Sequence, residues 1–281
     1  MKRTVRRAFP LFVLPTVAAF FIGFIVPFIW GVYLSFNKFT VVNNLQFVGF
    51  KNYVTMFKEG DFGHSLWYTA LFTVVSVVTI NVLAFLIALA LCKKFHGTRL
   101  FRTIFFMPNL IGGIVLGYIW QIILNGVLVH WKVTLTTNEW YGFWGLIILM
   151  NWQQIGYMMI IYIAGIMSVP QDLIESAMID GAGSWERLKS VIIPILRPSI
   201  TICTFLALTD CFKMYDQNLA LTGGAPANKT MMLALHIYNT YYNRKGFSGI
   251  GQAEGVVFTI LVLAIAGIQL KISRSREAKE V

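Results

Sequence analysis

Long apolar runs without a single charge dominate the chain. Four of them contain no Asp, Glu, Lys or Arg, and each exceeds the roughly 20 residues that a helix needs to cross a bilayer: Phe9–Asn37, Phe62–Cys92, Thr103–Trp131 and Trp140–Gln171. Within them we predict membrane crossings over residues 9–30, 69–91, 104–123 and 144–167. The first run is too long for a secretory signal peptide and no A-x-A site follows it, so we expect it to remain as a helix.

Three later stretches carry weaker signals. Residues 198–216 are interrupted by charges, and residues 252–270 hold Glu254 near one end, but both are long enough to cross. Met231–Asn243 is apolar yet too short, which favours a re-entrant or interfacial helix over a seventh crossing. The pattern predicts an all-α integral membrane protein with six transmembrane helices, forming one transmembrane domain over residues 1–281.

The composition agrees with a membrane protein. Of the 281 residues, 57% are hydrophobic and 12% are charged, against about a quarter charged in soluble domains. This difference excludes an ordinary soluble protein and a disordered one. The net charge of +11 would suggest nucleic acid in a polar chain. In so apolar a chain it indicates membrane orientation instead, and we expect no nucleic-acid partner.

The distribution of Lys and Arg predicts the orientation. With six crossings, 15 of the 23 basic residues fall on one side and 8 fall on the other, across longer segments. The denser side is cytoplasmic by the positive-inside rule. It holds both termini and two connections: Met1–Ala8, Cys92–Thr103, Ser168–Pro198 and Lys271–Val281. Asn43 and Asn228 then lie outside, and the chain is a multi-pass protein in contact with membrane lipid.

The sequence contains no recognisable catalytic or metal-binding motif. The P-loop, the H-E-x-x-H motif and the G-x-S-x-G motif are all absent, and the four histidines never pair at ligand spacing. Cys92, Cys203 and Cys211 are interpreted as small buried hydrophobic residues. We therefore expect no enzymatic activity, no catalytic residue, no metal and no cofactor bound by this chain itself.

The predicted cytoplasmic segment over residues 168–198 has the pattern of a helix, a turn and a second helix. Pro170 opens the first helix, with Asp172 and Glu175 in its first turns. The small run Gly181-Ala182-Gly183 ends that helix, and Ser184 is placed to cap the second. An ordinary amphipathic loop is the alternative that spacing alone leaves open.

This segment resembles the EAA loop of binding-protein-dependent ABC importer permeases. The family pattern is E-A-A, three residues, G, nine residues and I-x-L-P. Here Glu175-Ser176-Ala177 is followed at that spacing by Gly181 and by Val191-Ile192-Ile193-Pro194, with conservative changes at Ser176, Val191 and Ile193. The resemblance implies a cytoplasmic coupling helix that docks in a cleft of an ATPase subunit. Its contact residues would be Glu175, Ser176, Ala177, Asp180, Gly181 and Ala182.

Three further stretches are similar to the carbohydrate-type, MalF/UgpA-like branch of this family. They are FVGFKNY over residues 47–53, FRTIFFMP over residues 101–108, and FKMYDQ followed by LTGGAP between residues 212 and 226. The resemblance implies an importer of a carbohydrate, an oligosaccharide first of all, in a bacterial inner membrane. It implies as partners a second permease subunit, two ABC ATPase subunits that bind the ATP, and an extracellular or periplasmic solute-binding protein.

Charged side chains at membrane depth mark a second candidate site. On the predicted fifth helix, four polar residues fall within an arc of about 120° and share one face: Asp210, Lys213, Asp216 and Gln217. Charges at this depth usually face a watery cavity or a bundle interior and pair with each other. We predict that this face lines the substrate path, and the resemblance adds Phe212 and Tyr215. A network that only fixes helix packing is the alternative.

A second polar and aromatic stripe follows the predicted fourth helix. It consists of Asn151, Gln154, Tyr157 and Met158, at steps of three and four residues. Amides and aromatic rings suit a sugar, because hydroxyl groups bond to amides and C–H faces stack on rings. We predict that Asn151, Gln154 and Tyr157 contact substrate, with helix packing as the alternative.

Other classes of function stay open at this point. An ATPase-independent channel or secondary transporter is disfavoured by the EAA spacing, and a membrane-embedded enzyme is disfavoured by the missing catalytic motifs. Within the importers, glycerol 3-phosphate or another solute is the alternative substrate. Lys213 could bind an anion, but the two acids that flank it argue against this.

Overall fold

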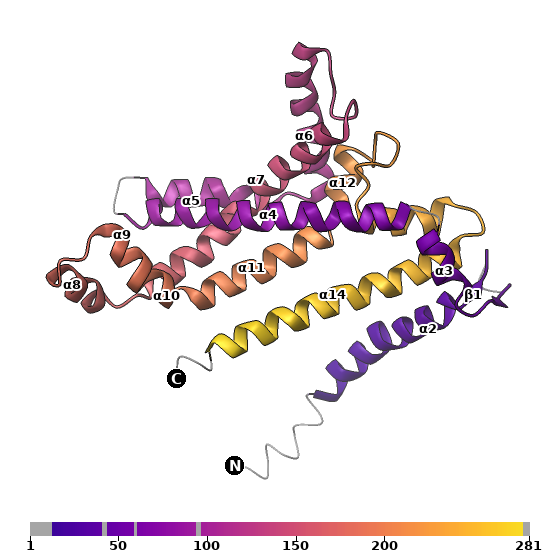
Figure 1. Cartoon of the computed structure of the whole chain (residues 1–281), viewed down its shortest axis with the longest axis horizontal. Coiled ribbons are helices and arrows are strands. Elements are labelled where there is room, and N and C mark those ends of the chain that lie inside the picture. Colours follow the sequence, from indigo (N-terminus) through magenta and orange to yellow (C-terminus); the bar gives the residue numbers. More distant parts are fainter. Residues whose placement is uncertain (1–12, 41–43, 59–60, 94–96, 278–281) are drawn as a thin grey trace, which may run out of the picture. The chain divides into compact units, whose positions relative to one another are not determined.

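The described part of the chain is almost entirely helical. The computed structural model (Figure 1) describes residues 13–40, 44–58, 61–93 and 97–277. Within these ranges, five helices are long and apolar enough to cross a membrane: Val13–Ser35, Asp61–Leu91, Gly113–Trp131, Glu139–Met167 and Ser248–Gln269. A bent pair, Ser184–Ile195 and Arg197–Phe212, becomes a sixth if it is taken as one span. The prediction of an all-α membrane protein is confirmed.

The chain divides into two compact units. Unit 1 comprises residues 1–62 and 236–260, and unit 2 comprises residues 63–235 and 261–281. In unit 1, α2 (Val26–Ser35) leads into a small antiparallel pair, β1 (Asn37–Lys38) and β2 (Gln46–Phe47), and then α3 (Lys51–Lys58). The end of α13 (Leu233–Tyr238), the turn η5 (Asn239–Asn243) and the first part of α14 (Ser248–Glu277) complete it.

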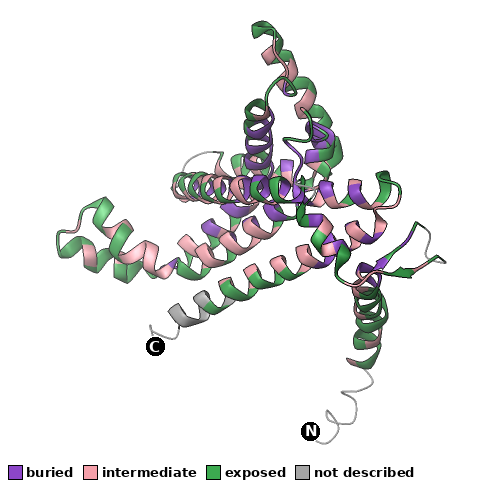
Figure 2. Ribbon diagram, turned by 45° about the vertical axis from the view of Figure 1, so that its right-hand side comes forward, coloured by how far each residue is buried: buried purple, intermediate pink, exposed green. Residues whose placement is uncertain are grey.

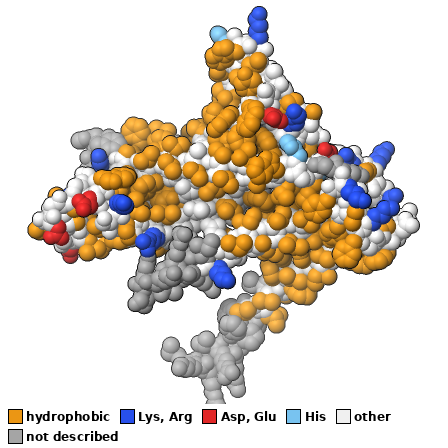
Figure 3. Space-filling view, in the orientation of Figure 1, with side chains coloured by type: hydrophobic (Ala, Val, Ile, Leu, Met, Phe, Trp, Pro, Cys, Tyr) orange, Lys and Arg blue, Asp and Glu red, His pale blue; other side chains and the backbone are white. Residues whose placement is uncertain are grey.

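Unit 2 holds most of the remaining helices. Their order along the chain is α4 (Asp61–Leu91), α5 (Thr98–Phe106), η2 (Met107–Leu110), α6 (Gly113–Leu128), η3 (Val129–Trp131), α7 (Glu139–Met167), α8 (Gln171–Ile179), α9 (Ser184–Arg187), η4 (Leu188–Ile192), α10 (Ile193–Ile195), α11 (Arg197–Phe212) and α12 (Asp216–Leu221). Hydrophobic side chains dominate the face shown in Figure 3, as expected where lipid replaces water as the solvent.

The core of unit 2 is built around α7. Buried residues concentrate on this helix (Figure 2), among them Leu146, Met150 and Met158. Gly156 of α7 allows α5 to approach, because a Cβ at this position would overlap the backbone carbonyl of Phe105. Small residues at such crossings let helix backbones pack closely in membrane proteins. The close approach fixes the start of the chain segment that carries Asn109.

Two prolines follow π-helical turns. The turn η1 (Phe21–Ile25) precedes Pro27, and η4 (Leu188–Ile192) precedes Pro194. Proline cannot donate a backbone hydrogen bond and its ring crowds the carbonyl four residues before it, so the helix widens locally. After the second of these turns, Pro198 lies at the start of α11 and the chain bends by 70° between Ile195 and Arg197.

All the predicted helices have somewhat different bounds in the structure, and two of them are interrupted. The helix expected over residues 104–123 is divided, because Pro108 and the pair Gly112-Gly113 interrupt it, and the long segment begins at Gly113. The helix expected over residues 198–216 ends at Phe212, and a new helix starts at Asp216. Residues 9–12 of the first predicted crossing, Asn43 and both termini lie outside the described residues.

Candidate functional site

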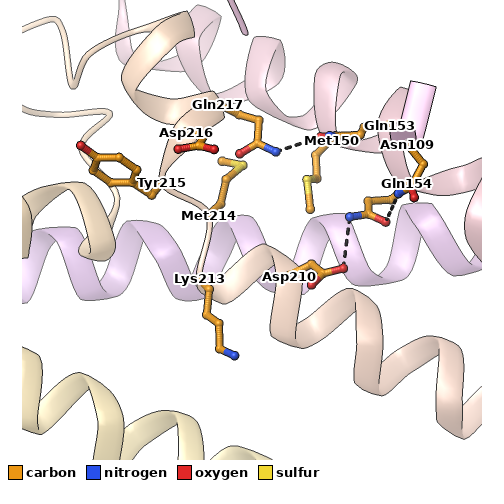
Figure 4. Close-up of a pocket in the computed structure, with 10 residues that line it drawn as sticks. All are labelled: Asn109, Met150, Gln153, Gln154, Asp210, Lys213, Met214, Tyr215, Asp216 and Gln217. Atoms are coloured by element: carbon orange, nitrogen blue, oxygen red, sulfur yellow. Dashed lines mark hydrogen bonds between the residues drawn. The ribbon is translucent and has the colours of Figure 1, made fainter. Parts of the chain in front are cut away.

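A polar pocket lies in unit 2 where α7, α11 and α12 meet η2. Its volume is about 400 Å³, and Figure 4 shows the ten side chains that line it: Asn109, Met150, Gln153, Gln154, Asp210, Lys213, Met214, Tyr215, Asp216 and Gln217. Asn109 comes from η2 and the next three residues come from α7. The other six run from Asp210, near the end of α11, through the link to Asp216 and Gln217 at the start of α12. Eight polar side chains therefore converge on one cavity beside the membrane-spanning helix α7.

Amide side chains organise the walls of the pocket. Asn109 Nδ2 donates to Gln154 Oε1 over 3.3 Å, and Gln154 Nε2 donates to Asp210 Oδ2 over 3.1 Å. On the adjacent wall, Gln217 Nε2 donates to Gln153 Oε1 over 2.8 Å. Figure 4 shows both series as dashed lines. Each amide keeps further donor and acceptor capacity for a ligand, because a Gln or Asn side chain offers two N–H groups and two lone pairs.

The charges in the pocket are arranged differently from the prediction. Because α11 ends at Phe212, the residues Asp210, Lys213 and Asp216 do not share one helix face. Among the described residues, no ion pair joins Lys213 to either acid. In Figure 4 the Lys213 side chain extends away from Asp216. The prediction that they share one helix face was therefore wrong, although all three residues line the same cavity.

Glycines of α6 set the position of α12 at the pocket. A Cβ added at Gly113 would lie 2.8 Å from Asp216 Cβ and 3.0 Å from Gln217 Cδ. One turn further, a Cβ at Gly117 would lie 2.5 Å from Ala220 Cβ. The two helices can approach this closely only because these positions lack side chains. The contact places Asp216 and Gln217 at the edge of the cavity.

The predicted substrate-path residues divide into two groups. Gln154, Asp210, Lys213, Tyr215 and Asp216 line the pocket, whereas Asn151, Tyr157 and Phe212 do not. Asn151 Nδ2 donates to Thr79 Oγ1 over 2.9 Å, so it joins α7 to α4. Tyr157 packs beside Phe106, with ring centroids 6.5 Å apart. Phe212 is buried. Of the stripe predicted on α7, only Gln154 therefore lines the cavity.

Sequence reasoning missed four lining residues: Asn109, Met150, Gln153 and Met214. The adjacent pair Gln153-Gln154 in the middle of an apolar helix was an available signal, since polar residues at membrane depth rarely face lipid. Asn109 lies in the predicted crossing over residues 104–123, and Pro108 before it is the signal that this crossing is interrupted. Met150 and Met214 carry no signal of their own.

The segment expected to be cytoplasmic forms the predicted helix, turn and second helix. At the end of α8, Ala182 N–H donates to Ala177 O over 2.9 Å and Gly181 N–H donates to Met178 O over 3.1 Å. This pair of bonds is the Schellman motif, which needs a left-handed residue after the helix. Gly181 supplies it with φ +81°, and a Cβ there would meet nothing within 4 Å. Positive φ, and not a close approach within this chain, therefore requires this glycine.

Polar and apolar side chains of this segment both face outward. Glu175, Ser176, Asp180 and Gly181 are exposed, and Ala177 and Ala182 are partly so. Large apolar residues beside them are also uncovered: Leu173, Met178, Ile179 and Trp185. Ser184 does not cap the second helix, because Gly183 takes the cap position with extended backbone, and the Ser184 hydroxyl accepts instead from Arg187 Nη2 over 3.1 Å.

The sequence of this chain is similar to those of known transport proteins. The model of the family described as binding-protein-dependent transport system inner membrane component matches residues 80–277. The probable starch degradation products transport system permease protein AmyD of Thermoanaerobacterium thermosulfurigenes is 40% identical over 277 residues, covering 96% of this chain and 94% of that protein. The trehalose/maltose transport system permease protein MalF of Thermococcus litoralis is 30% identical, covering 95% and 93%.

Solved structures share the fold. A chain of the bacterial alginate ABC transporter, solved in complex with an alginate pentasaccharide-bound periplasmic protein, superposes with a TM-score of 0.82 at 21% identity, covering 98% of this chain and 97% of that one. At this identity the likeness concerns the fold alone. The family match over most of the chain and the two relatives lead to one conclusion: this multi-pass membrane protein belongs to the family of binding-protein-dependent transport system inner membrane components.

Proposed function

We propose that the chain is the permease subunit of an ABC importer that carries a neutral oligosaccharide through the pocket at α7, α11 and α12. The observation that carries the proposal is the pocket itself, in which amides and carboxylates gather beside the membrane-spanning helix α7. The printed names of the relatives, for starch degradation products and for trehalose and maltose, favour a sugar. An oligosaccharide agrees with the first of these names.

The lining of the pocket suits hydroxyl-rich ligands. Asn109, Gln153, Gln154 and Gln217 offer both donors and acceptors, and the carboxylates of Asp210 and Asp216 offer acceptors alone. Tyr215 supplies an aromatic face and Met150 an adaptable apolar surface for the C–H groups of a sugar ring. Two acids against one Lys disfavour an anion, so glycerol 3-phosphate is the weaker candidate.

The helix pair α8 and α9 is proposed as the contact with the ATPase. Large apolar side chains exposed on a segment outside the bilayer cost free energy unless a partner covers them, and Leu173, Ile179 and Trp185 are exposed on this helix pair. Glu175 and Asp180 of the same segment offer acceptors to basic groups or backbone amides of the partner. ATP binding then changes the permease because the two states differ in their contact energy at this surface.

The remaining parts of the assembly follow from the same proposal. A second permease subunit completes the translocation path, two ATPase subunits bind and hydrolyse ATP, and a solute-binding protein outside the membrane delivers the sugar. The excess of Lys and Arg on the side of residues 168–198 supports a cytoplasmic position for that segment and for both termini, in a bacterial inner membrane.

Reconstitution tests the function directly. The assembled importer in proteoliposomes should take up labelled maltooligosaccharide only with ATP inside and binding protein outside, and its ATP hydrolysis should rise when both are present. Uptake without ATP would instead support a channel or secondary transporter. Stimulation by glycerol 3-phosphate and not by the sugar would contradict the proposed substrate class.

A further inference from the structure

The short helix α3 presents an uncovered apolar stripe. Phe50 accepts the first helical hydrogen bond, from Val54 N–H, so Phe50, Val54 and Phe57 fall within about 60° of one another around the helix. Their exposed fractions are 71%, 49% and 63%. Phe47 in β2, just before the helix, is 72% exposed. On the opposite face, Asn52 and Met56 are buried. Four large apolar side chains thus face outward from one short segment.

Hydrogen bonds to the end of α2 hold α3 in this orientation. Asn52 Nδ2 donates to the carbonyl of Ser35 over 2.7 Å and to the carbonyl of Asn37 over 2.9 Å. The hydroxyl groups of Tyr53 and Ser35 lie 2.7 Å apart. The bond to Ser35 satisfies a carbonyl that the C-terminus of a helix leaves without a partner. Turning the apolar stripe inward would break all of these hydrogen bonds, so its exposure is built into unit 1.

The same contacts place α3 at the end of two membrane-spanning helices. The span Val13–Ser35 ends at the carbonyl that Asn52 binds, and Ser248–Gln269 begins beside it, since a Cβ at Gly249 would overlap the carbonyl of Asn37. Figure 1 shows α3 at this end of α2. Trp30 and Tyr33 on the last turns of α2 are exposed, with ring centroids 5.3 Å apart. Such aromatic residues mark the membrane interface.

Basic residues border the stripe. Lys51 and Lys58 are exposed on one flank of α3. From Asn37 to Lys58 the sequence holds three lysines and no acidic residue. Phenylalanine on one side and lysine along its edge is the composition of helices that lie in the bilayer interface and contact anionic headgroups. A water-soluble partner would account for the charge but would leave the position of the stripe at the bilayer boundary unexplained.

We infer that α3 is an interfacial anchor, with Phe50, Val54 and Phe57, joined by Phe47, inserted among the lipids of the leaflet at which α2 ends. Lys51 and Lys58 then lie at the level of the lipid phosphates. The anchor fixes the depth of the ends of α2 and α14, to which α3 is bonded and packed. The inference rests on the membrane-spanning helices and does not depend on which solute is transported.

Spin-label accessibility tests this in the assembled importer. Single cysteines are introduced at Phe50, Val54 and Phe57, with a matched aqueous control at the exposed Thr136, in a chain whose three native cysteines are replaced by alanine. Labelled complexes are placed in nanodiscs of phosphatidylcholine and phosphatidylglycerol. Power saturation then compares the collision rates with oxygen, which enriches in the acyl region, and with a water-soluble nickel chelate.

At all three α3 positions, oxygen collisions should exceed nickel collisions, and the order should be reversed at position 136. Nickel collisions that exceed oxygen collisions at positions 50, 54 and 57 would show a water-facing helix and overturn the inference. Exclusion of both reagents would show a protein partner on the stripe and would overturn it as well. A matched variant with Lys51→Gln and Lys58→Gln should reduce the depth of the labels in anionic nanodiscs, and a depth that does not change would remove the lysines from the anchor.

Discussion

Gln154 and Asp210 are 56 positions apart in the sequence, and the amide Nε2 of the first donates to the carboxylate Oδ2 of the second over 3.1 Å. The bond joins α7 to α11 at the wall of the pocket. Asn109 donates to the same amide from the other side, so the orientation of the Gln154 side chain is determined by two neighbours. The Gln154 side chain therefore connects α7, α11 and η2, and its replacement should affect the packing of all three.

The first prediction concerns Gln154→Leu. The change removes the donor to Asp210, and a carboxylate that loses its hydrogen bond in a partly buried site costs about 1–3 kcal/mol. We expect a lower melting temperature of the complex together with uptake reduced at least tenfold. The double variant Gln154→Leu with Asp210→Leu should regain much of the melting temperature, because no unpaired charge is left, while uptake stays low. Normal uptake in the double variant would remove this wall from the substrate path.

The second prediction concerns Asp216→Asn. Since no ion pair among the described residues joins Lys213 to Asp216, Asp216→Asn should leave the yield of assembled complex within about twofold of the parent. If Asp216 binds a sugar hydroxyl, uptake per complex should fall and the KM for sugar should rise. Lys213→Met combined with Asp216→Asn should behave like Asp216→Asn alone in yield. A large loss of yield that the second change restores would instead reveal a structural charge pair.

Gly181 allows a matched comparison with Gly183. Gly181 has φ +81°, whereas Gly183 has φ −66° and ψ 168°, and neither has an atom near its Cβ position. Valine should be accepted at position 183 but should strain position 181 by about 1–2 kcal/mol or more, because a β-branched residue disfavours the left-handed region. We expect Gly181→Val to abolish sugar-stimulated ATP hydrolysis and Gly183→Val to retain it. Gly181→Asn, which tolerates this region, should retain part of it. Equal hydrolysis in all three variants would contradict a coupling role for the turn.

Gly156 provides a test of the helix packing. A Cβ there would overlap the Phe105 carbonyl, whereas a Cβ at Gly126 of α6 would meet nothing within 4 Å. Overpacking of this kind costs typically about 1–3 kcal/mol, so Gly156→Ala should lower the melting temperature of the complex and displace Asn109 from the pocket. Gly126→Ala should leave the melting temperature unchanged or raise it, because alanine is the better helix former. Similar effects of the two changes would contradict the close approach of α5 and α7.

Orientation is tested by cysteine labelling in intact cells. The distribution of 15 basic residues against 8 leads us to expect that a membrane-impermeant maleimide labels position 228 from outside, and position 184 only after the membrane is opened. Both residues are exposed, so accessibility within the chain does not limit the reaction. Labelling of position 184 in intact cells would contradict the proposed topology.

The spans could be predicted from the sequence because lipid selects for composition. A run of charge-free residues over Phe62–Cys92 or Trp140–Gln171 has few other interpretations, and both became single long helices. The turn at Gly181 was likewise predictable, because glycine after an amphipathic helix satisfies a local backbone requirement. Both the spans and the turn are determined by residues that are close to one another in the sequence.

The pocket could be predicted only in part, because it depends on contacts across the chain. The break between Phe212 and Asp216 has no Gly or Pro to mark it, and it is accompanied by the close contact of α12 with Gly113 and Gly117 of α6. Gln153 and Gln154 are adjacent, yet the first bonds to Gln217 and the second to Asp210. A helical stripe drawn at three- and four-residue steps follows one wall and so finds only one of the pair.

The two π-helical turns before Pro27 and Pro194 have a consequence for the divergence of this family. A π-turn accommodates one residue more than an α-helical turn, so removing one residue from 21–25 or from 188–192 would return the helix to regular winding instead of breaking it. Loss or gain of a residue elsewhere in a span would rotate all following side chains by about 100°. Single-residue length changes between relatives should therefore collect at these two turns. The prolines would then mark positions where the chain tolerates a change in length without losing the register of its buried surfaces.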